Sequence, residues 1–254
     1  MLNLTEELKR AERAATLAGD LLLAGMPESQ TVLSEIGRDI KLQADQDAEA
    51  VIIDALRESG HAVLAEESGE HGELGADTLA WVVDPLDGTY NYSRRIPFCA
   101  VSIALCRGDA PLLGVILDFN RGDMYSGIAG EGAWLNGEPM RVSGITERKQ
   151  AVLMTGVPER SVFTPEVLTE YVHRLAAFKK VRLLGSAAMM LAYVSSGKAD
   201  AYLENDIMFW DIAAGVAILQ GAGGWVSVEP SERIAWGRRV RGAARPALWD
   251  ETPA

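Results

Sequence analysis

The amino-acid sequence predicts a mixed α/β fold of the α+β kind, in two lobes that pack as one unit. Three features support this. Two helical patterns stand near the N-terminus, short apolar runs separated by turn residues fill the middle, and strand-like and helix-like segments alternate from about residue 151. We therefore expect an N-terminal α+β lobe at residues 1–150 and a C-terminal α/β lobe at residues 151–254.

Both N-terminal helices follow from the spacing of apolar residues. In residues 4–22, leucines and alanines recur at alternating steps of four and three, which places them on one face, and Gly25 marks the end of that helix. A second apolar stripe predicts a helix at about residues 46–59. We expect Asp45 to be its N-cap, because a short carboxylate side chain can accept from a free backbone N–H there.

The rest of the chain predicts strands and then alternating elements. The expected middle strands are residues 61–65, 80–83, 98–106, 114–119, 123–128 and 133–136. Turn signals such as Asn136-Gly137 separate them and favour consecutive antiparallel hairpins. In the C-terminal lobe we expect strands at residues 152–155, 181–184, 201–204 and 225–228, and helices at residues 165–178, 187–196 and 210–220.

Composition excludes several classes of function. The formal net charge of −12 would repel polyanions, so we expect no nucleic-acid partner. The apolar runs are short and interrupted, so we expect no membrane span, and no secretory signal is visible. Cys99 and Cys106 stand alone in one strand-like stretch and give no disulfide framework. These features predict a cytoplasmic protein.

The run from Trp81 to Tyr92 carries the most chemical information. A strand delivers Asp84 to its end, and Gly88 then permits a sharp turn. This arrangement can direct the carboxylates of Asp84 and Asp87 towards one point, with the Leu86 carbonyl between them, and such hard oxygen ligands suit Mg²⁺. The N–H groups after the turn could hold phosphate oxygens. The alternative is a surface turn, because Asp, Pro and Gly are common turn residues.

Three further acidic positions have a structural and a functional interpretation. Glu66 and its neighbour Glu67 follow a predicted strand, where α/β proteins place their sites, although adjacent glutamates are often only solvated charge. Asp211 and Asp45 each precede a predicted helix, where an N-cap role alone would explain them. A capping aspartate can also offer an oxygen to a metal, so the two interpretations are compatible.

Three of these motifs together resemble the signatures of the inositol monophosphatase family. They are Ala65-Glu66-Glu67-Ser68, Asp84-Pro85-Leu86-Asp87-Gly88-Thr89-Tyr90-Asn91-Tyr92 and Trp210-Asp211-Ile212-Ala213-Ala214-Gly215. They occur in the family's order and roughly its spacing, and the similarity extends from about residue 36 to residue 228. The resemblance implies a layered α-β-α-β-α sandwich, a homodimer, inhibition by lithium and a cluster of two or three Mg²⁺ ions.

Carried over residue by residue, the resemblance implies three sets of site residues. The metal ligands would be Glu66, Asp84, the carbonyl of Leu86, Asp87 and Asp211. The pair that orients and activates the attacking water would be Asp45 and Thr89. The substrate contacts would be Gly88, Thr89, Gly185, Ser186, Ala187 and Glu204.

The activity implied by the resemblance is Mg²⁺-dependent hydrolysis of a small-molecule phosphate monoester, with myo-inositol monophosphate as the first candidate. Glu204 favours a polyol, because an anionic acceptor suits neighbouring hydroxyls. Fructose 1,6-bisphosphate, adenosine 3′,5′-bisphosphate and histidinol phosphate stay open, since five basic residues could reach a second phosphate: Arg94, Arg95, Lys179, Lys180 and Arg182. A non-catalytic metal-binding module is the alternative from another class, but it would need neither Thr89 nor Asp45.

Overall fold

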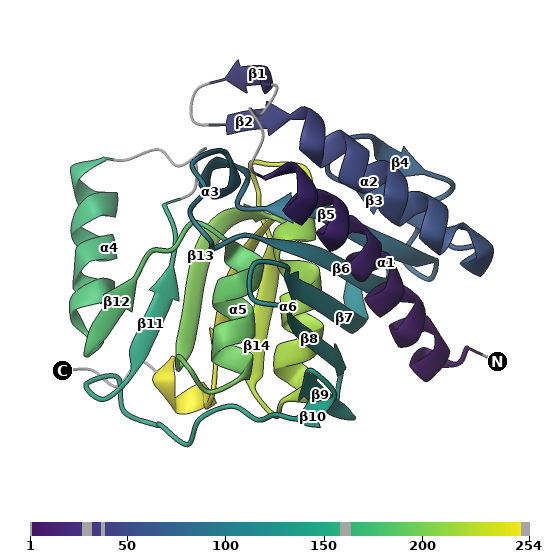
Figure 1. Cartoon of the computed structure of the whole chain (residues 1–254). Coiled ribbons are helices and arrows are strands. Elements are labelled where there is room, and N and C mark those ends of the chain that lie inside the picture. Colours follow the sequence, from purple (N-terminus) through teal and green to yellow (C-terminus); the bar gives the residue numbers. More distant parts are fainter. Residues whose placement is uncertain (1, 27–31, 37–38, 158–163, 250–254) are drawn as a thin grey trace.

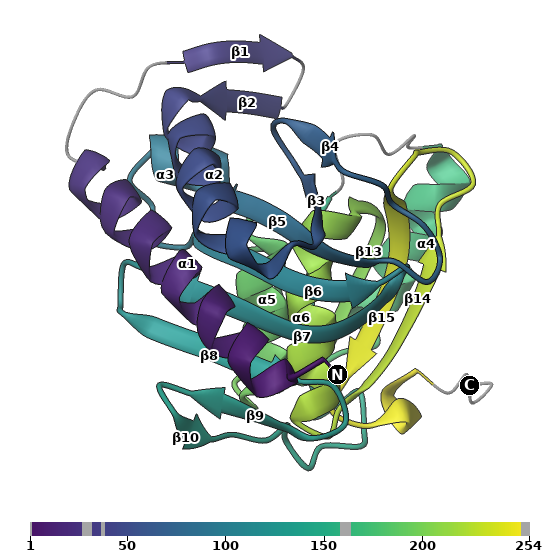
Figure 2. The same cartoon turned by 90° about the vertical axis from the view of Figure 1, so that its right-hand side faces the viewer.

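Residues 2–26, 32–36, 39–157 and 164–249 are described by the computed structural model. They form five layers, in which two helices, a sheet, two helices, a second sheet and one outer helix follow one another (Figures 1 and 2). This is the α-β-α-β-α sandwich that the resemblance implies. Within these residues no helix combines the length and the apolar character needed to span a bilayer.

The first layer consists of α1 (Leu4–Gly25) and α2 (Gln43–Leu56). The apolar face of α1 packs against the eight-stranded sheet, and the alanines at positions 11, 14, 15 and 18 are fully buried there. Small side chains let the helix approach the sheet closely. A Cβ atom at Gly19 would lie 2.5 Å from Leu117 Cδ2, so a larger residue at this position would have to displace the Leu117 side chain.

The larger sheet has the strand order β10-β9-β8-β7-β6-β5-β3-β4. Its strands are β3 (Ala62–Ala65), β4 (Gly69–His71), β5 (Leu79–Asp87), β6 (Ala100–Arg107), β7 (Ala110–Asp118), β8 (Asp123–Ile128), β9 (Gly132–Leu135) and β10 (Glu138–Pro139). Consecutive strands from β5 to β10 pair antiparallel, as the turn signals predict, and β3 runs parallel to β5. Along β5, Trp81 and Val83 face α1 and α2, whereas Val82 faces the central helices.

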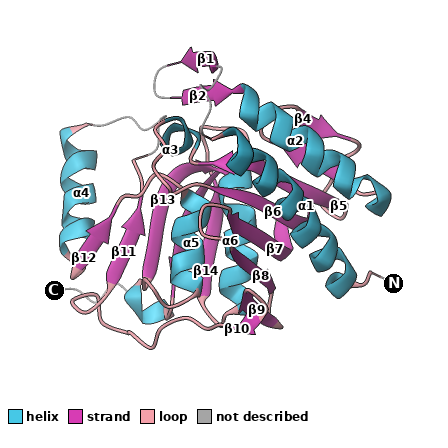
Figure 3. Cartoon of the chain, viewed as in Figure 1, coloured by secondary structure: helices cyan, strands magenta, loops and turns pink. Residues whose placement is uncertain are grey.

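The central layer holds α5 (Ala187–Ser195) and α6 (Phe209–Gly221), which are buried between the two sheets (Figure 3). Both helices are apolar on nearly every side, as expected for helices covered on two faces. The contact with β7 is so close that a Cβ atom at Gly114 would lie 2.3 Å from the Ala214 carbonyl oxygen. One core therefore joins residues from both halves of the chain.

The second sheet has the strand order β12-β11-β13-β15-β14. Its strands are β11 (Val152–Thr155), β12 (Lys180–Arg182), β13 (Ala201–Met208), β14 (Trp225–Pro230) and β15 (Gly237–Ala243). Its outer face is covered by α4 (Pro165–Ala176), which contributes Leu175, and by the C-terminal segment around Leu248. Along the chain, the change from the first sheet to the second lies between β10 and β11.

Several element boundaries differ from the predictions. The second helix begins at Gln43, so Asp45 is its third residue and not its N-cap, and α6 begins at Phe209, so Asp211 is likewise the third residue. The strand predicted at residues 181–184 is Lys180–Arg182, and the one at 201–204 continues to Met208. Five strands were not predicted: β4, β10, β15, and the two-stranded sheet of β1 (Val32–Ile36) and β2 (Asp39–Leu42).

Candidate active site

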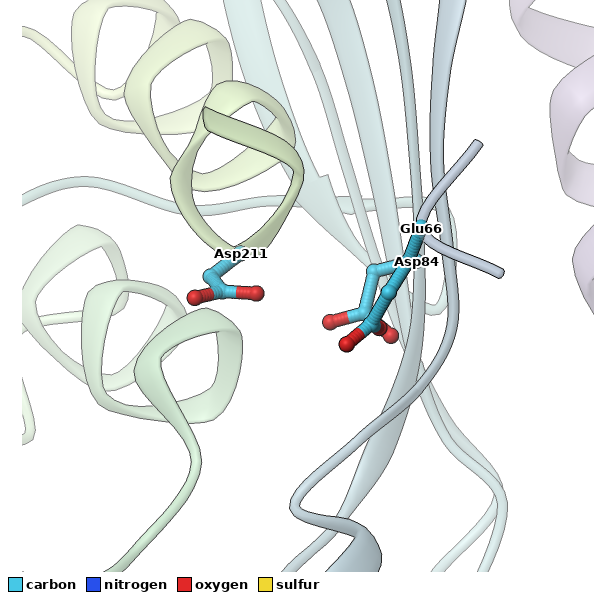
Figure 4. Close-up of side chains that lie close together, drawn as sticks. All are labelled: Glu66, Asp84 and Asp211. Atoms are coloured by element: carbon cyan, nitrogen blue, oxygen red, sulfur yellow. The ribbon is translucent and has the colours of Figure 1, made fainter. Parts of the chain in front are cut away.

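Three carboxylates from distant parts of the chain meet where the eight-stranded sheet faces the start of α6. Glu66 lies directly after β3, Asp84 lies within β5, and Asp211 lies in the first turn of α6. One carboxylate oxygen from each lies within 4.8 Å of the others, and in Figure 4 Asp211 faces the other two from the opposite side. Asp84 is buried, and Glu66 and Asp211 are half-buried. The grouping that the sequence predicts for these three residues is therefore present.

The turn after β5 is built by local contacts. The pairing of β5 with β6 is irregular between Asp84 and Asp87, and the Leu86 N–H donates to Asp84 Oδ1 at 2.9 Å. Gly88 then adopts φ 91°, a left-handed conformation that glycine favours, and α3 (Thr89–Ser93) begins. Because Asp84, Leu86 and Asp87 are all buried, the surface-turn alternative is wrong.

Two acidic residues on α2, Asp45 and Glu49, lie one helical turn apart and hydrogen-bond to Thr89 and to the loop after β3. Asp45 Oδ2 accepts from the Leu42 N–H at 2.8 Å, and Thr89 Oγ1 lies 2.9 Å from Asp45 Oδ1 and 3.0 Å from the Leu86 carbonyl oxygen. Glu49 accepts from the backbone N–H groups of Glu67 and Ser68, at 2.8 and 2.9 Å. The helix therefore fixes both the Thr89 hydroxyl and the loop that carries Glu66.

Asp87 is held by the start of α5. Its Oδ2 accepts from the Ser186 hydroxyl at 2.5 Å and from the Ala188 N–H at 2.7 Å, and its Oδ1 accepts from the Ala187 N–H at 3.3 Å. A carboxylate is stabilised at this position because the first N–H groups of a helix have no partner within it. Asp87 is thus close to the three-carboxylate group but takes its own orientation from the start of α5.

Electrostatics show that the acidic group is costly without a counter-charge. Burial raises the pKa of Glu66 to about 8, and burial together with neighbouring carboxylates raises the pKa of Asp84 and of Asp211 well above the usual range. Burial also raises the pKa of Asp45 to about 7 and that of Asp87 to about 6. Clustered oxygen donors whose charges repel one another are a donor set that fits a divalent cation.

A cavity of about 450 Å³ opens from this group towards the second sheet. Every substrate residue expected from the sequence lines it: Gly88, Thr89, Gly185, Ser186, Ala187 and Glu204. Glu204 is buried on β13, and burial raises the pKa of its carboxyl group to about 7. The acidic group and Glu204 therefore face one shared space.

The sequence reasoning missed four residues around this cavity. Lys41 lines the cavity, and its Nζ lies 2.9 Å from Glu67 Oε2. Glu49 could have been noticed, because it places a carboxylate on the apolar face of α2, four residues after Asp45. The other two, Tyr202 and Gly156, lie beside Glu204. Tyr202 shares a strand face with Glu204, since residues two apart on a strand point the same way.

Comparisons with known proteins find similar sequences and similar structures. A sequence model described as the inositol monophosphatase family matches residues 3–248, well beyond the span that the motifs indicate. The Nus factor SuhB of Escherichia coli is 36% identical over 228 residues, which cover 87% of this chain and 84% of that protein. The inositol-1-monophosphatase of Synechocystis is 36% identical over 225 residues, covering 87% and 78%. The solved inositol monophosphatase of Anabaena superimposes with a TM-score of 0.80 at 34% identity, covering 97% of this chain and 94% of that one.

Proposed function

Because the chain belongs to the inositol monophosphatase family, we propose that it uses Mg²⁺ to hydrolyse the phosphate ester of a small metabolite, and that this metabolite is myo-inositol monophosphate. One observation supports the proposal above all. Glu66, Asp84 and Asp211 come from three separate elements, yet their oxygens gather within 4.8 Å of one another in a cavity that Glu204 also lines. Family membership supports a phosphatase, and this arrangement supports the metal and the substrate.

Five groups would hold the metal ions in this proposal. They are the side chains of Glu66, Asp84, Asp87 and Asp211 and the carbonyl of Leu86, which line the cavity. Bound Mg²⁺ would supply positive charge against the phosphate oxygens and lower the pKa of the attacking water. Two or three ions would offset the carboxylate charges, and inhibition by lithium and a homodimer belong to the same proposal.

Thr89 and Asp45 would move the proton. The attacking water gives its proton to Thr89 Oγ1 as the hydroxyl proton of Thr89 passes to Asp45 Oδ1, 2.9 Å away. Burial raises the pKa of Asp45 to about 7, which makes it a better base near neutral pH than an ordinary aspartate. The water oxygen then bonds to phosphorus as the ester P–O bond breaks. The departing alkoxide takes a proton from solvent in the cavity.

Glu204 supports a polyol as the leaving group. Its carboxylate can accept from two neighbouring hydroxyls, and it would repel a second phosphate group. The basic residues that could favour a bisphosphate do not line the cavity in the described part of the chain: Arg94, Arg95, Lys179, Lys180 and Arg182. Fructose 1,6-bisphosphate, adenosine 3′,5′-bisphosphate and histidinol phosphate are therefore the comparison substrates.

Steady-state kinetics on these four esters, with Mg²⁺ and after chelation, test the proposal. We expect the highest kcat/KM with inositol monophosphate and no turnover after chelation. Asp84→Asn should abolish turnover of every ester. Asp77→Asn is the matched control, since Asp77 is exposed in the loop before β5. Full turnover without a divalent cation, or by Asp84→Asn, would contradict the metal assignment.

A Nus-factor role is the second candidate, because relatives of that name match as well as those named for the phosphatase. The net charge of −12 argues against direct contact with RNA, so a protein component of the transcription complex would be the partner. An in vitro transcription assay with the wild-type chain and Asp84→Asn separates the roles. A Nus-factor role predicts the same effect on elongation with both proteins, and no effect with either removes this candidate.

A further inference from the structure

Glu204 is held in the cavity by its surroundings. Tyr202 and Glu204 project from the same face of β13, and the Tyr202 hydroxyl donates to Glu204 Oε2 at 2.7 Å. Tyr202 is fully buried and its ring belongs to the core between the two sheets. Burial and the neighbouring Glu204 raise the pKa of Tyr202 well above its usual value, so the hydroxyl keeps its proton and acts as the donor. A rigid donor therefore fixes one carboxylate oxygen of Glu204.

The other side of the carboxylate meets a glycine. A Cβ atom at Gly156 would lie 2.3 Å from Glu204 Oε1 and 2.7 Å from its carboxyl carbon. Gly156 does not adopt a positive φ, so residues other than glycine could adopt its backbone conformation. Glycine at position 156 is therefore explained by the space that the Glu204 carboxylate needs, and not by the backbone conformation.

Two hydrogen bonds keep this glycine in place. The Tyr171 hydroxyl on α4 donates to the Gly156 carbonyl oxygen at 2.9 Å. The Thr155 hydroxyl donates to the Leu203 carbonyl oxygen at 2.6 Å, which joins the end of β11 to β13. The wall beside Glu204 cannot retreat without breaking these contacts, so an added methyl group would move the carboxylate.

We propose that Tyr202 is a positioning residue for Glu204 and that Gly156 sets the space for its carboxylate, so that both select a leaving group that carries hydroxyls. This inference rests on the proposed function. A carboxylate fixed on one oxygen by Tyr202 presents its remaining lone pairs to the cavity in a single orientation. Hydroxyls of a polyol can match that orientation, whereas a leaving group without hydroxyls gains nothing from it.

The test compares inositol 1-phosphate with 4-nitrophenyl phosphate, whose leaving group has no other hydroxyl. Tyr202→Phe removes one oxygen and keeps the ring. We expect KM for the inositol ester to rise roughly fivefold to tenfold, the effect of losing one ordinary hydrogen bond, with kcat within about twofold. For the aryl ester, both KM and kcat of Tyr202→Phe should stay within about twofold of the wild-type values. Gly156→Ala should raise KM for the inositol ester by at least about tenfold and spare the aryl ester.

A double-mutant cycle shows whether Tyr202 acts through Glu204. In a Glu204→Ala background, Tyr202→Phe should change KM for the inositol ester by less than about twofold. Tyr92→Phe is the matched control, because it removes another buried hydroxyl, which donates to the Leu22 carbonyl oxygen at 2.7 Å. It should leave the ratio of kcat/KM for the two esters unchanged.

The outcomes separate this inference from the proposed function. If Tyr202→Phe lowered kcat/KM equally for both esters, or kept its full effect in the Glu204→Ala background, the role of Tyr202 would be purely structural. Either result would overturn this inference and leave the proposed function in place. A wild-type chain that hydrolyses neither ester would overturn the proposed function and this inference with it. If Tyr202→Phe does not fold, Gly156→Ala decides by the same ratio of kcat/KM values.

Discussion

Replacing Glu66 by glutamine tests the acidic group directly, because the side-chain shape stays and the charge is lost. Burial raises the pKa of Glu66 from 4.5 to about 8. Between these values the folded chain holds a proton that the unfolded chain has released, so the folded state binds more protons. The contribution of Glu66 to the free energy of unfolding of the metal-free chain therefore falls as the pH rises from about 4.5 to 8.

The size of this effect follows from the pKa difference. A difference of about 3.5 units, at 1.36 kcal/mol per unit, gives a cost of up to about 4 kcal/mol at pH 8 and less than about 1 kcal/mol at pH 5. Glutamine carries no such cost. Without metal we expect Glu66→Gln to raise Tm by roughly 10 °C at pH 8 and by only about 2 °C at pH 5.

Thermal unfolding followed by circular dichroism measures both quantities. The melt in chelator gives the cost of the Glu66 charge, and the melt in excess Mg²⁺ gives the stabilisation by the bound metal. Mg²⁺ should stabilise the wild-type chain strongly and Glu66→Gln weakly, because the metal binds the native carboxylates. Glu70→Gln is the matched control, since Glu70 is exposed on β4. If Glu66→Gln were no more stable than the wild type in chelator at pH 8, the assigned burial and repulsion at Glu66 would be wrong.

Four other predictions concern catalysis, metal and backbone. Thr89→Ala should lower kcat by about a hundredfold to a thousandfold with little change in KM, and a change in KM alone would contradict its role in proton transfer. Asp87→Asn should abolish turnover while circular dichroism shows an intact fold, so near-normal activity would refute its assignment as a ligand. Gly88→Ala should cost roughly 1–3 kcal/mol in urea unfolding, because φ is 91° and a Cβ atom would lie 3.1 Å from the carbonyl oxygens of Gly185 and Phe98; an unchanged midpoint would refute this. Chelation should lower Tm at pH 8 and added Mg²⁺ should restore it, whereas identical melting curves would argue against a bound cation.

Much of the core and of the site was predictable from the sequence. The even spacing of apolar residues in α1 and the consecutive turn signals between β5 and β9 indicate the first layers because local packing and local turn geometry produce those patterns. Asp84, Asp87 and Asp211 were predictable as site residues because they stand near the end of a strand or the start of a helix, where the backbone fixes the direction of the side chains. The motifs therefore identified the acidic group before its geometry was known.

Other elements depend on contacts that no local pattern records. The strand β15 contains Arg238, which is buried because its guanidinium group lies 4.6 Å above the Phe209 ring and bonds to Asp109 at 2.9 Å. A buried arginine interrupts the apolar alternation by which strands are recognised. In the strand pair of β1 and β2, the apolar side chains of Val32 and Leu33 are exposed, so these two residues do not show the buried alternation by which strands are recognised. In the same way, the positions of Tyr202 and Gly156 around Glu204 arise from the pairing of β11 with β13.

Anomalous diffraction from crystals grown with Mn²⁺ in place of Mg²⁺ tests the central idea most directly, since it locates the ion itself. We predict an anomalous peak from a Mn²⁺ ion that is coordinated by oxygens of Glu66, Asp84 and Asp211, at the point where the three side chains in Figure 4 converge. A saturated crystal with no peak there, or with Mn²⁺ only on surface carboxylates elsewhere, would contradict a metal-dependent phosphatase built on these residues.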